Sequence, residues 1–176
     1  ATNAIPFGGT PTAATLDKLL PGLKALPGKT LVLLVTDGGP NCNAELACDA
    51  SDCQANIEGC SGFTCCDSGG NCCEPDQPWG PTGCIDHEAT IAAVNAYEKA
   101  DVPVYVVGIP GSESYADILE QMAIAAGTAQ VAKPFYYAVD DVDHLRDALG
   151  GIAAVAISCV FTIDDPPSEV GQTNVY

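Results

Sequence analysis

The sequence Lys-Thr-Leu-Val-Leu-Leu-Val-Thr-Asp-Gly-Gly-Pro-Asn-Cys, residues 29–42, joins an apolar run to an abrupt polar end. Its apolar part, residues 31–35, does not alternate with polar residues, which is the pattern of a parallel strand buried on both faces. The cluster from Thr36 to Pro40 cannot continue a strand. Asp37 is therefore predicted at the carboxyl end of a central strand, at the edge of an open α/β sheet where ligands bind.

A helix is predicted before this strand. Thr10 followed by Pro11 is typical of a helix start, with Thr10 as the N-cap and Pro11 at the first helical position. Leucines follow at spacings of three and four and form one apolar face, which Pro21 is expected to kink or shorten.

Helical and strand patterns alternate again after residue 85. They predict a helix at 86–100, a strand at 104–107, a helix ending at Gly127, a strand at 135–139 and a helix across 142–152. This order indicates a doubly wound α/β fold with a mainly parallel, Rossmann-like sheet. Residues 159–176 are predicted to start a C-terminal β extension.

Cysteines give the second strong signal. There are ten, and they favour disulfides in an oxidising compartment, hence a secreted or cell-surface protein. Zinc fits less well, because no Cys-x-x-Cys pair occurs and two Cys-Cys dipeptides do. The nine between 42 and 84 are an odd number, so one must pair with Cys159, pair with another part of a longer chain, or stay free. The predicted disulfide cysteines are Cys42, Cys48, Cys53, Cys60, Cys65, Cys66, Cys72, Cys73, Cys84 and Cys159.

Residues 38–85 differ from the rest of the chain in composition. Gly, Pro, Asn, Asp, Ser and Cys dominate, without a helical or strand period. We interpret this stretch as a disulfide-rich insertion that follows the carboxyl end of the central strand; its pairing cannot be deduced from spacing.

The charge balance restricts the partners. With 23 acidic and 6 basic residues the chain has a net charge of −17, which repels phosphate backbones and attracts cations. Nucleic acid is therefore excluded as an expected partner, and no apolar run reaches the ~18 residues that membrane insertion needs. The charge is also explained by solubility alone.

An enzyme is not expected. The chain contains no Gly-x-Ser-x-Gly elbow, phosphate-binding loop or His-Glu-x-x-His motif. A binding module and a structural subunit remain as the two classes of function.

Several stretches resemble the second half of a von Willebrand factor A domain. They are Gly-Gly-Thr-Pro-Thr at 8–12, the strand leading into Thr36-Asp37-Gly38, the strand at 104–108, and Tyr-Tyr-Ala-Val-Asp-Asp at 136–141. The resemblance spans about residues 5–158 and is, more narrowly, to Cys-rich secreted A-type domains of bacteria. It implies a partial A-type domain over 1–158, with 38–85 as its insertion.

The resemblance implies a metal-ion-dependent adhesion site. Thr10 would supply a hydroxyl ligand and Asp37 an acidic one, direct or through water, to Mg²⁺, Mn²⁺ or Ca²⁺, all of which take oxygen ligands. A carboxylate of a protein ligand would complete the shell, as in an extracellular adhesion module. The alternative is a structural subunit of an extracellular or cell-surface assembly. Thr10 as a helix cap and Asp37 as a turn residue are the purely structural interpretations.

One family motif is missing from this sequence. No Asp-x-Ser-x-Ser triplet occurs; the nearest string, at 49–53, ends in Cys. The first strand of the family is absent as well, so residues 31–35 would form an open sheet edge. We therefore expect a preceding segment or a second chain to complete the sheet.

Overall fold

A computed structural model describes residues 9–59, 66 and 69–156. Three parallel strands form a small open sheet in the order β1-β2-β3. Val32 lies opposite Val104, and Val107 lies opposite Tyr137. The strands are β1 (Val32–Thr36), β2 (Val104–Gly108) and β3 (Tyr137–Ala138).

Helices connect and flank these strands, which confirms an α/β fold compatible with a Rossmann-like arrangement. Within the described residues, short 3₁₀ turns accompany them at Ala50–Asp52, Pro81–Gly83 and Glu113–Tyr115. The α-helices are α1 (Thr12–Lys24), α2 (Gln54–Glu58), α3 (His87–Lys99), α4 (Ala116–Ala125) and α5 (Val142–Ala156).

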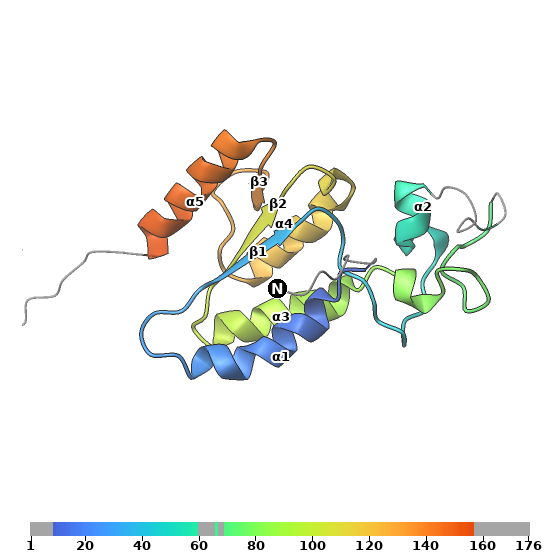
Figure 1. Ribbon diagram of the computed structural model, residues 1–176, viewed down its shortest axis with the longest axis horizontal. Coiled ribbons are helices and arrows are strands. Elements are labelled where there is room, and N and C mark those ends of the chain that lie inside the picture. Colours follow the sequence, from blue (N-terminus) through green and yellow to red (C-terminus); the bar gives the residue numbers. More distant parts are fainter. Residues whose placement is uncertain (1–8, 60–65, 67–68, 157–176) are drawn as a thin grey trace, which may run out of the picture.

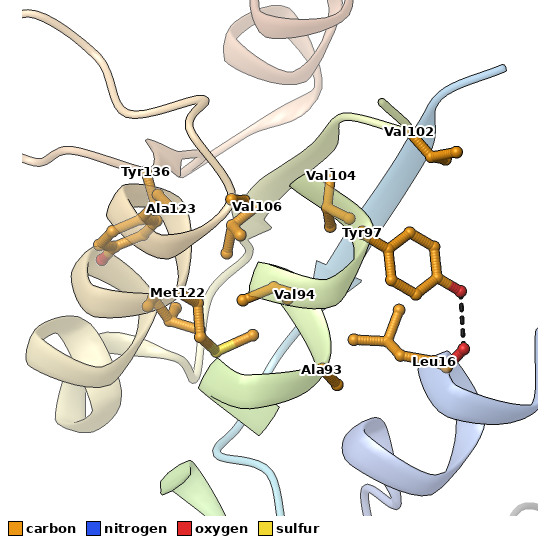
Figure 2. Packing of buried hydrophobic residues seen from close by; sticks show 12 residues of the cluster. Leu16, Ala93, Val94, Tyr97, Val102, Val104, Val106, Met122, Ala123 and Tyr136 are labelled. Atoms are coloured by element: carbon orange, nitrogen blue, oxygen red, sulfur yellow. Dashed lines mark hydrogen bonds between the residues drawn. The ribbon is translucent and has the colours of Figure 1, made fainter. Parts of the chain in front are cut away.

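Alternate residues of β2 build two cores on opposite faces of the sheet, as the period of a strand requires. Val104 and Val106 pack against α1, α3 and α4, and Figure 2 shows this core, in which the Tyr97 hydroxyl donates to the carbonyl of Leu16 at 2.7 Å. Tyr105 and Val107 pack on the other face, against α5. Figure 1 shows α5 on one side of the sheet and α1 and α3 on the other.

The start of α1 corrects a prediction. Thr10 is not the N-cap: the helix begins at Thr12, Pro11 holds the cap position, and no side chain caps it. Both backbone groups of Thr10 bind Asn41, which joins Thr10 to the loop after β1, and the Thr10 carbonyl also accepts from the Thr12 N–H at 2.7 Å. Pro21 lies within the helix, which continues to Lys24.

The third strand is shorter than the predicted 135–139. The carbonyls of Phe135 and Tyr136 accept from the backbone N–H and the side-chain amide of Gln130, at 2.8 and 2.6 Å. These bonds hold the chain before Tyr137 against the 126–134 loop. The final helix, by contrast, passes through Gly150 and Gly151 and ends beyond the predicted 152.

The β1 strand is not buried on both faces as its sequence pattern predicted. It is the edge of the sheet within the described residues, and Val35 is 45% exposed. Val32 donates to the carbonyl of Pro103, and Thr36 accepts from Ile109, each at 2.9 Å. Because residues alternate along a parallel ladder, the backbone groups of Leu33 and Val35 point away from β2.

The disulfide-rich insertion is present and projects from one end of the sheet (Figure 1). It contains the disulfides Cys48–Cys84, Cys53–Cys73 and Cys66–Cys72. Cys42, one of the cysteines predicted in a disulfide, is instead free and half-buried. Cys60, Cys65, Cys159 and the predicted β extension lie outside the described residues. The insertion also contains a short helix, α2, which its composition did not predict.

Candidate functional site

The turn after β1 fixes the position of Asp37. The buried Thr36 hydroxyl donates to the Gly38 carbonyl at 2.8 Å and accepts from the Gly38 N–H at 3.2 Å. These two bonds close a tight turn around Asp37, whose side chain is exposed and makes no hydrogen bond or ion pair within the described residues. The strand end therefore presents one free carboxylate.

The loop after β2 lies directly against this turn. Ile109 donates its N–H to the carbonyl of Thr36 at 2.9 Å. Gly111 has a φ of +109°, and a Cβ there would stand 2.8 Å from the Asp37 carbonyl oxygen. Only glycine permits this conformation and this approach without strain. Glu113 accepts from the Gly111 N–H at 2.9 Å and holds the loop in place.

Asn41 brings Thr10 to the same place, the loop at the carboxyl end of β1. Its N–H donates to the Thr10 carbonyl at 2.9 Å, and its side-chain oxygen accepts from the Thr10 N–H. The structure thus brings the loop that holds Thr10 to the loop that holds Asp37 (Figure 1). The Thr10 side chain is half-buried, and its hydroxyl has no hydrogen-bond partner in the described part of the chain.

The insertion covers the other side of the β1 turn. A Cβ at Gly39 would stand 2.5 Å from the Tyr115 ring, so this backbone lies directly against the ring. Tyr115 is 1% exposed, and its hydroxyl donates to Glu58 of α2 at 2.8 Å. Burial, and then the hydrogen bond to this carboxylate, raise the pKa of Tyr115.

A chain of side-chain hydrogen bonds continues from Glu58 to Thr10. The Glu58 carboxylate accepts from the Gln54 amide at 3.0 Å, and the Gln54 oxygen accepts from the Asn41 amide. Asn41 is 2% exposed and uses its backbone N–H, its amide nitrogen and its side-chain oxygen. Sequence reasoning missed Asn41, Gln54, Glu58 and Tyr115. Gln54 and Glu58 are four positions apart, but the bonds Asn41–Gln54 and Tyr115–Glu58 join residues 13 and 57 positions apart, which no local pattern relates.

The acidic residues that follow β3, Asp140 and Asp141, lie next to the start of α5. Asp141 accepts from the backbone N–H of His144 at 2.8 Å and so caps α5. This bond, with His144 close by, lowers the pKa of Asp141. Asp140 and Asp141 also lie 3.7 and 3.8 Å from the His144 ring nitrogen. Asp141 therefore already has a structural role as the cap of α5.

The two predicted ligands suit a hard cation in chemical type, and their loops are joined through Asn41. A hydroxyl and a carboxylate are oxygen donors, which Mg²⁺ and Ca²⁺ prefer. Two donors fill a minority of the roughly six places around such an ion, so water or further groups must supply the others. The metal roles of Thr10 and Asp37 stay predictions.

A cysteine cluster is the other group with metal-ligand chemistry. Within the described residues, only Cys48, Cys73 and Cys84 bring three candidate ligand atoms within 4.8 Å of one another. All three belong to disulfides, which leaves no thiolate for zinc.

Comparison with known protein families, curated proteins and solved structures finds no match for this chain. Within the described residues, no helix combines the length and apolarity that crossing a membrane requires.

Proposed function

We propose that this chain is an extracellular ligand-binding module of the von Willebrand factor A type, which uses a divalent cation to bind a carboxylate of a protein partner. The proposal rests on one observation: the loop containing Thr10 is bonded to the loop that follows Asp37, at the carboxyl end of β1. Their hydroxyl and carboxylate have no hydrogen-bond partners in the described part of the chain, so both are available to an ion.

The chemistry of such a site follows from its donor set. One carboxylate and one hydroxyl leave a divalent ion incompletely neutralised, so a carboxylate from outside can displace water and complete the shell. Thr10 and Asp37 would hold the ion, while Thr36 and Gly111 fix the backbone around Asp37. The disulfides of the insertion support the extracellular assignment, because such bonds persist in oxidising compartments.

Calorimetric titration with Mn²⁺ tests the proposal. The unmodified chain should bind the ion, and Asp37→Ala should lower the affinity at least roughly tenfold, because a ligating charge is lost. Asp147→Ala is the matched control, since Asp147 is exposed on α5 and forms no hydrogen bond or ion pair within the described residues. Equal Mn²⁺ binding by all three proteins would exclude Asp37 as a ligand.

A second candidate function is favoured by the open edge of β1. Leu33 and Val35 direct outward backbone groups that have no partner among the described residues, and Val35 is 45% exposed. Such an edge is a template for another strand. A structural subunit of an extracellular assembly would use this edge and the insertion for contacts, and a cation would be incidental.

Chelation and reduction separate the two functions. If the cation site is the function, a chelator abolishes partner binding while the disulfide-held fold persists. If assembly is the function, a chelator leaves the assembled state unchanged and a reductant disrupts it. Sedimentation of the treated protein, with and without partner, measures both outcomes.

A further inference from the structure

The hydrogen bonds around Asn41 join three separate segments. Asn41 follows the β1 turn, Thr10 precedes α1, and Gln54 begins α2 of the insertion. Asn41 is 2% exposed, so each of its polar atoms would be costly to leave unpaired. The Asn41 side-chain oxygen also accepts from the Cys42 thiol at 3.1 Å. The orientation of Asn41 is therefore decided by Thr10 and Cys42 at its oxygen and by Gln54 at its amide nitrogen.

Gln54 is itself held in one orientation. Its amide nitrogen donates to the Glu58 carboxylate at 3.0 Å, which leaves its oxygen to accept from Asn41. The same Glu58 oxygen accepts from the buried Tyr115 hydroxyl at 2.8 Å. Tyr115 packs under Gly39, in the loop that leads from Asp37 to Asn41. The chain of hydrogen bonds thus begins at Asn41 and ends at Tyr115, whose ring packs against the same loop.

The base of α2 is fixed by the cystines. Cys53 precedes Gln54, is fully buried and pairs with Cys73. It also forms a β-bridge with Cys84, whose neighbour Ile85 donates to the Asp52 carbonyl at 2.8 Å. The position of Gln54 is therefore set by the covalent frame of the insertion and not by the sheet alone.

We infer that the insertion positions the proposed cation loops, with Asn41 as the positioning residue for Thr10 and with Gln54, Glu58 and Tyr115 holding the Asn41 side chain. This inference rests on the proposed function for the role of the ion. The hydrogen bonds themselves hold independently of the ion. A change confined to Gln54, which forms no hydrogen bond with Thr10 or Asp37 within the described residues, is thus expected to alter the Thr10 loop.

Hydrogen exchange of the Thr10 and Asn41 amides tests the inference without any cation. Gln54→Leu should speed exchange at Thr10 roughly three- to tenfold, because Asn41 loses the partner that orients it. Tyr115→Phe should give a smaller acceleration. The matched controls are Gln121→Leu, which loses an exposed bond to Asp117, and Tyr97→Phe, which loses a buried bond to Leu16.

Titration of the same proteins with Mn²⁺ separates this inference from the proposed function. Faster exchange with weaker Mn²⁺ binding in Gln54→Leu, and neither change in Gln121→Leu, supports both. Faster exchange in a protein whose unmodified form does not bind Mn²⁺ supports the positioning and overturns the proposed function. Unchanged Thr10 exchange in Gln54→Leu overturns the positioning, whether or not the ion binds.

Discussion

Gly38 and Gly39 are adjacent in sequence but face different surroundings. A Cβ at Gly39 would meet the Tyr115 ring at 2.5 Å and Ile85 at 3.0 Å, whereas a Cβ at Gly38 would meet its nearest neighbours at 3.9 Å. The first distance is a steric overlap and the second is an ordinary van der Waals contact. The Gly-Gly pair of the motif therefore has one position that only glycine fills and one that tolerates a methyl group.

We predict that Gly39→Ala lowers the free energy of unfolding by about 1–3 kcal/mol, because the Tyr115 ring must shift in a packed environment. Gly38→Ala is the matched control and should change the stability little. Urea unfolding followed by fluorescence or circular dichroism measures both. Equal stability of the two variants would contradict the packing described for Tyr115.

Tyr115 also gives a prediction about alkaline pH. Its folded-state pKa is raised, first by burial and then by the Glu58 hydrogen bond, so the folded protein retains a proton that the unfolded chain releases near pH 10. The stabilisation is complete below that pH and is lost as the pH rises through the folded-state value. Stability should therefore fall above about pH 10, and less steeply in Tyr115→Phe.

The comparison for this pH effect is Tyr97→Phe. The pKa of Tyr97 is also raised, chiefly by burial, but its hydroxyl donates to a neutral carbonyl. Thermal midpoints of the three proteins between pH 8 and pH 11 should rank Tyr115→Phe as the least pH-dependent. A steeper decline for Tyr115→Phe than for Tyr97→Phe would count against the Tyr115–Glu58 bond.

The candidate site could be predicted in part from local sequence. Asp37 at a strand end follows from five apolar residues that stop at a turn, and the structure places it there. Asn41 could not be identified in this way, because its partners Thr10 and Gln54 meet it only when the segment before α1 and α2 dock against the loop after β1. The same docking explains the error at Thr10, whose backbone binds Asn41 and does not cap α1.

For the strands as well, the local sequence pattern predicts that a strand forms, but the surrounding structure decides its burial and its length. β2 was predicted from its apolar run and is buried along its whole length. β1 has an equally apolar run, but its pattern cannot state how many neighbours the strand has, and Val35 is 45% exposed. β3 was predicted too long, since Gln130 binds carbonyls that the strand would otherwise use.

The edge of β1 predicts self-association. Leu31, Leu33 and Val35 lie on or beside an edge that is open in the part of the chain that the structure describes, and residues 31–35 carry no charge. Natural edges usually carry lysine or another blocking residue. Val35→Lys should therefore reduce the apparent mass of the protein in concentration-dependent sedimentation, with little change in the thermal midpoint.

Ile124→Lys is the control for this edge. Ile124 is 55% exposed, but it lies on α4 and offers no unpaired strand backbone. An equal loss of self-association in both variants would mean that exposed apolar area, and not the strand edge, drives the association. If the unmodified protein is monomeric at all concentrations, the β1 edge is excluded as an assembly surface for copies of this chain.

The net charge of −17 makes the folded protein sensitive to any salt, and not only to a specifically bound cation. Excess carboxylates repel one another and weaken the compact state, and any salt relieves this repulsion by screening. A divalent ion therefore raises the thermal midpoint even without a site. Only the stabilisation beyond that given by NaCl at equal ionic strength reports binding to the folded protein.

We predict such an excess for Mg²⁺ or Ca²⁺. A ligand that binds only the folded state adds about 2.7 kcal/mol when its concentration is a hundred times its Kd. Asp37→Ala should remove the excess, because it deletes the proposed ligand, while Asp147→Ala removes an equal charge from α5 and should keep it. If the divalent salts and NaCl give superimposable midpoints for the unmodified protein, screening accounts for the whole effect and the assembly function becomes the better explanation of the open edge.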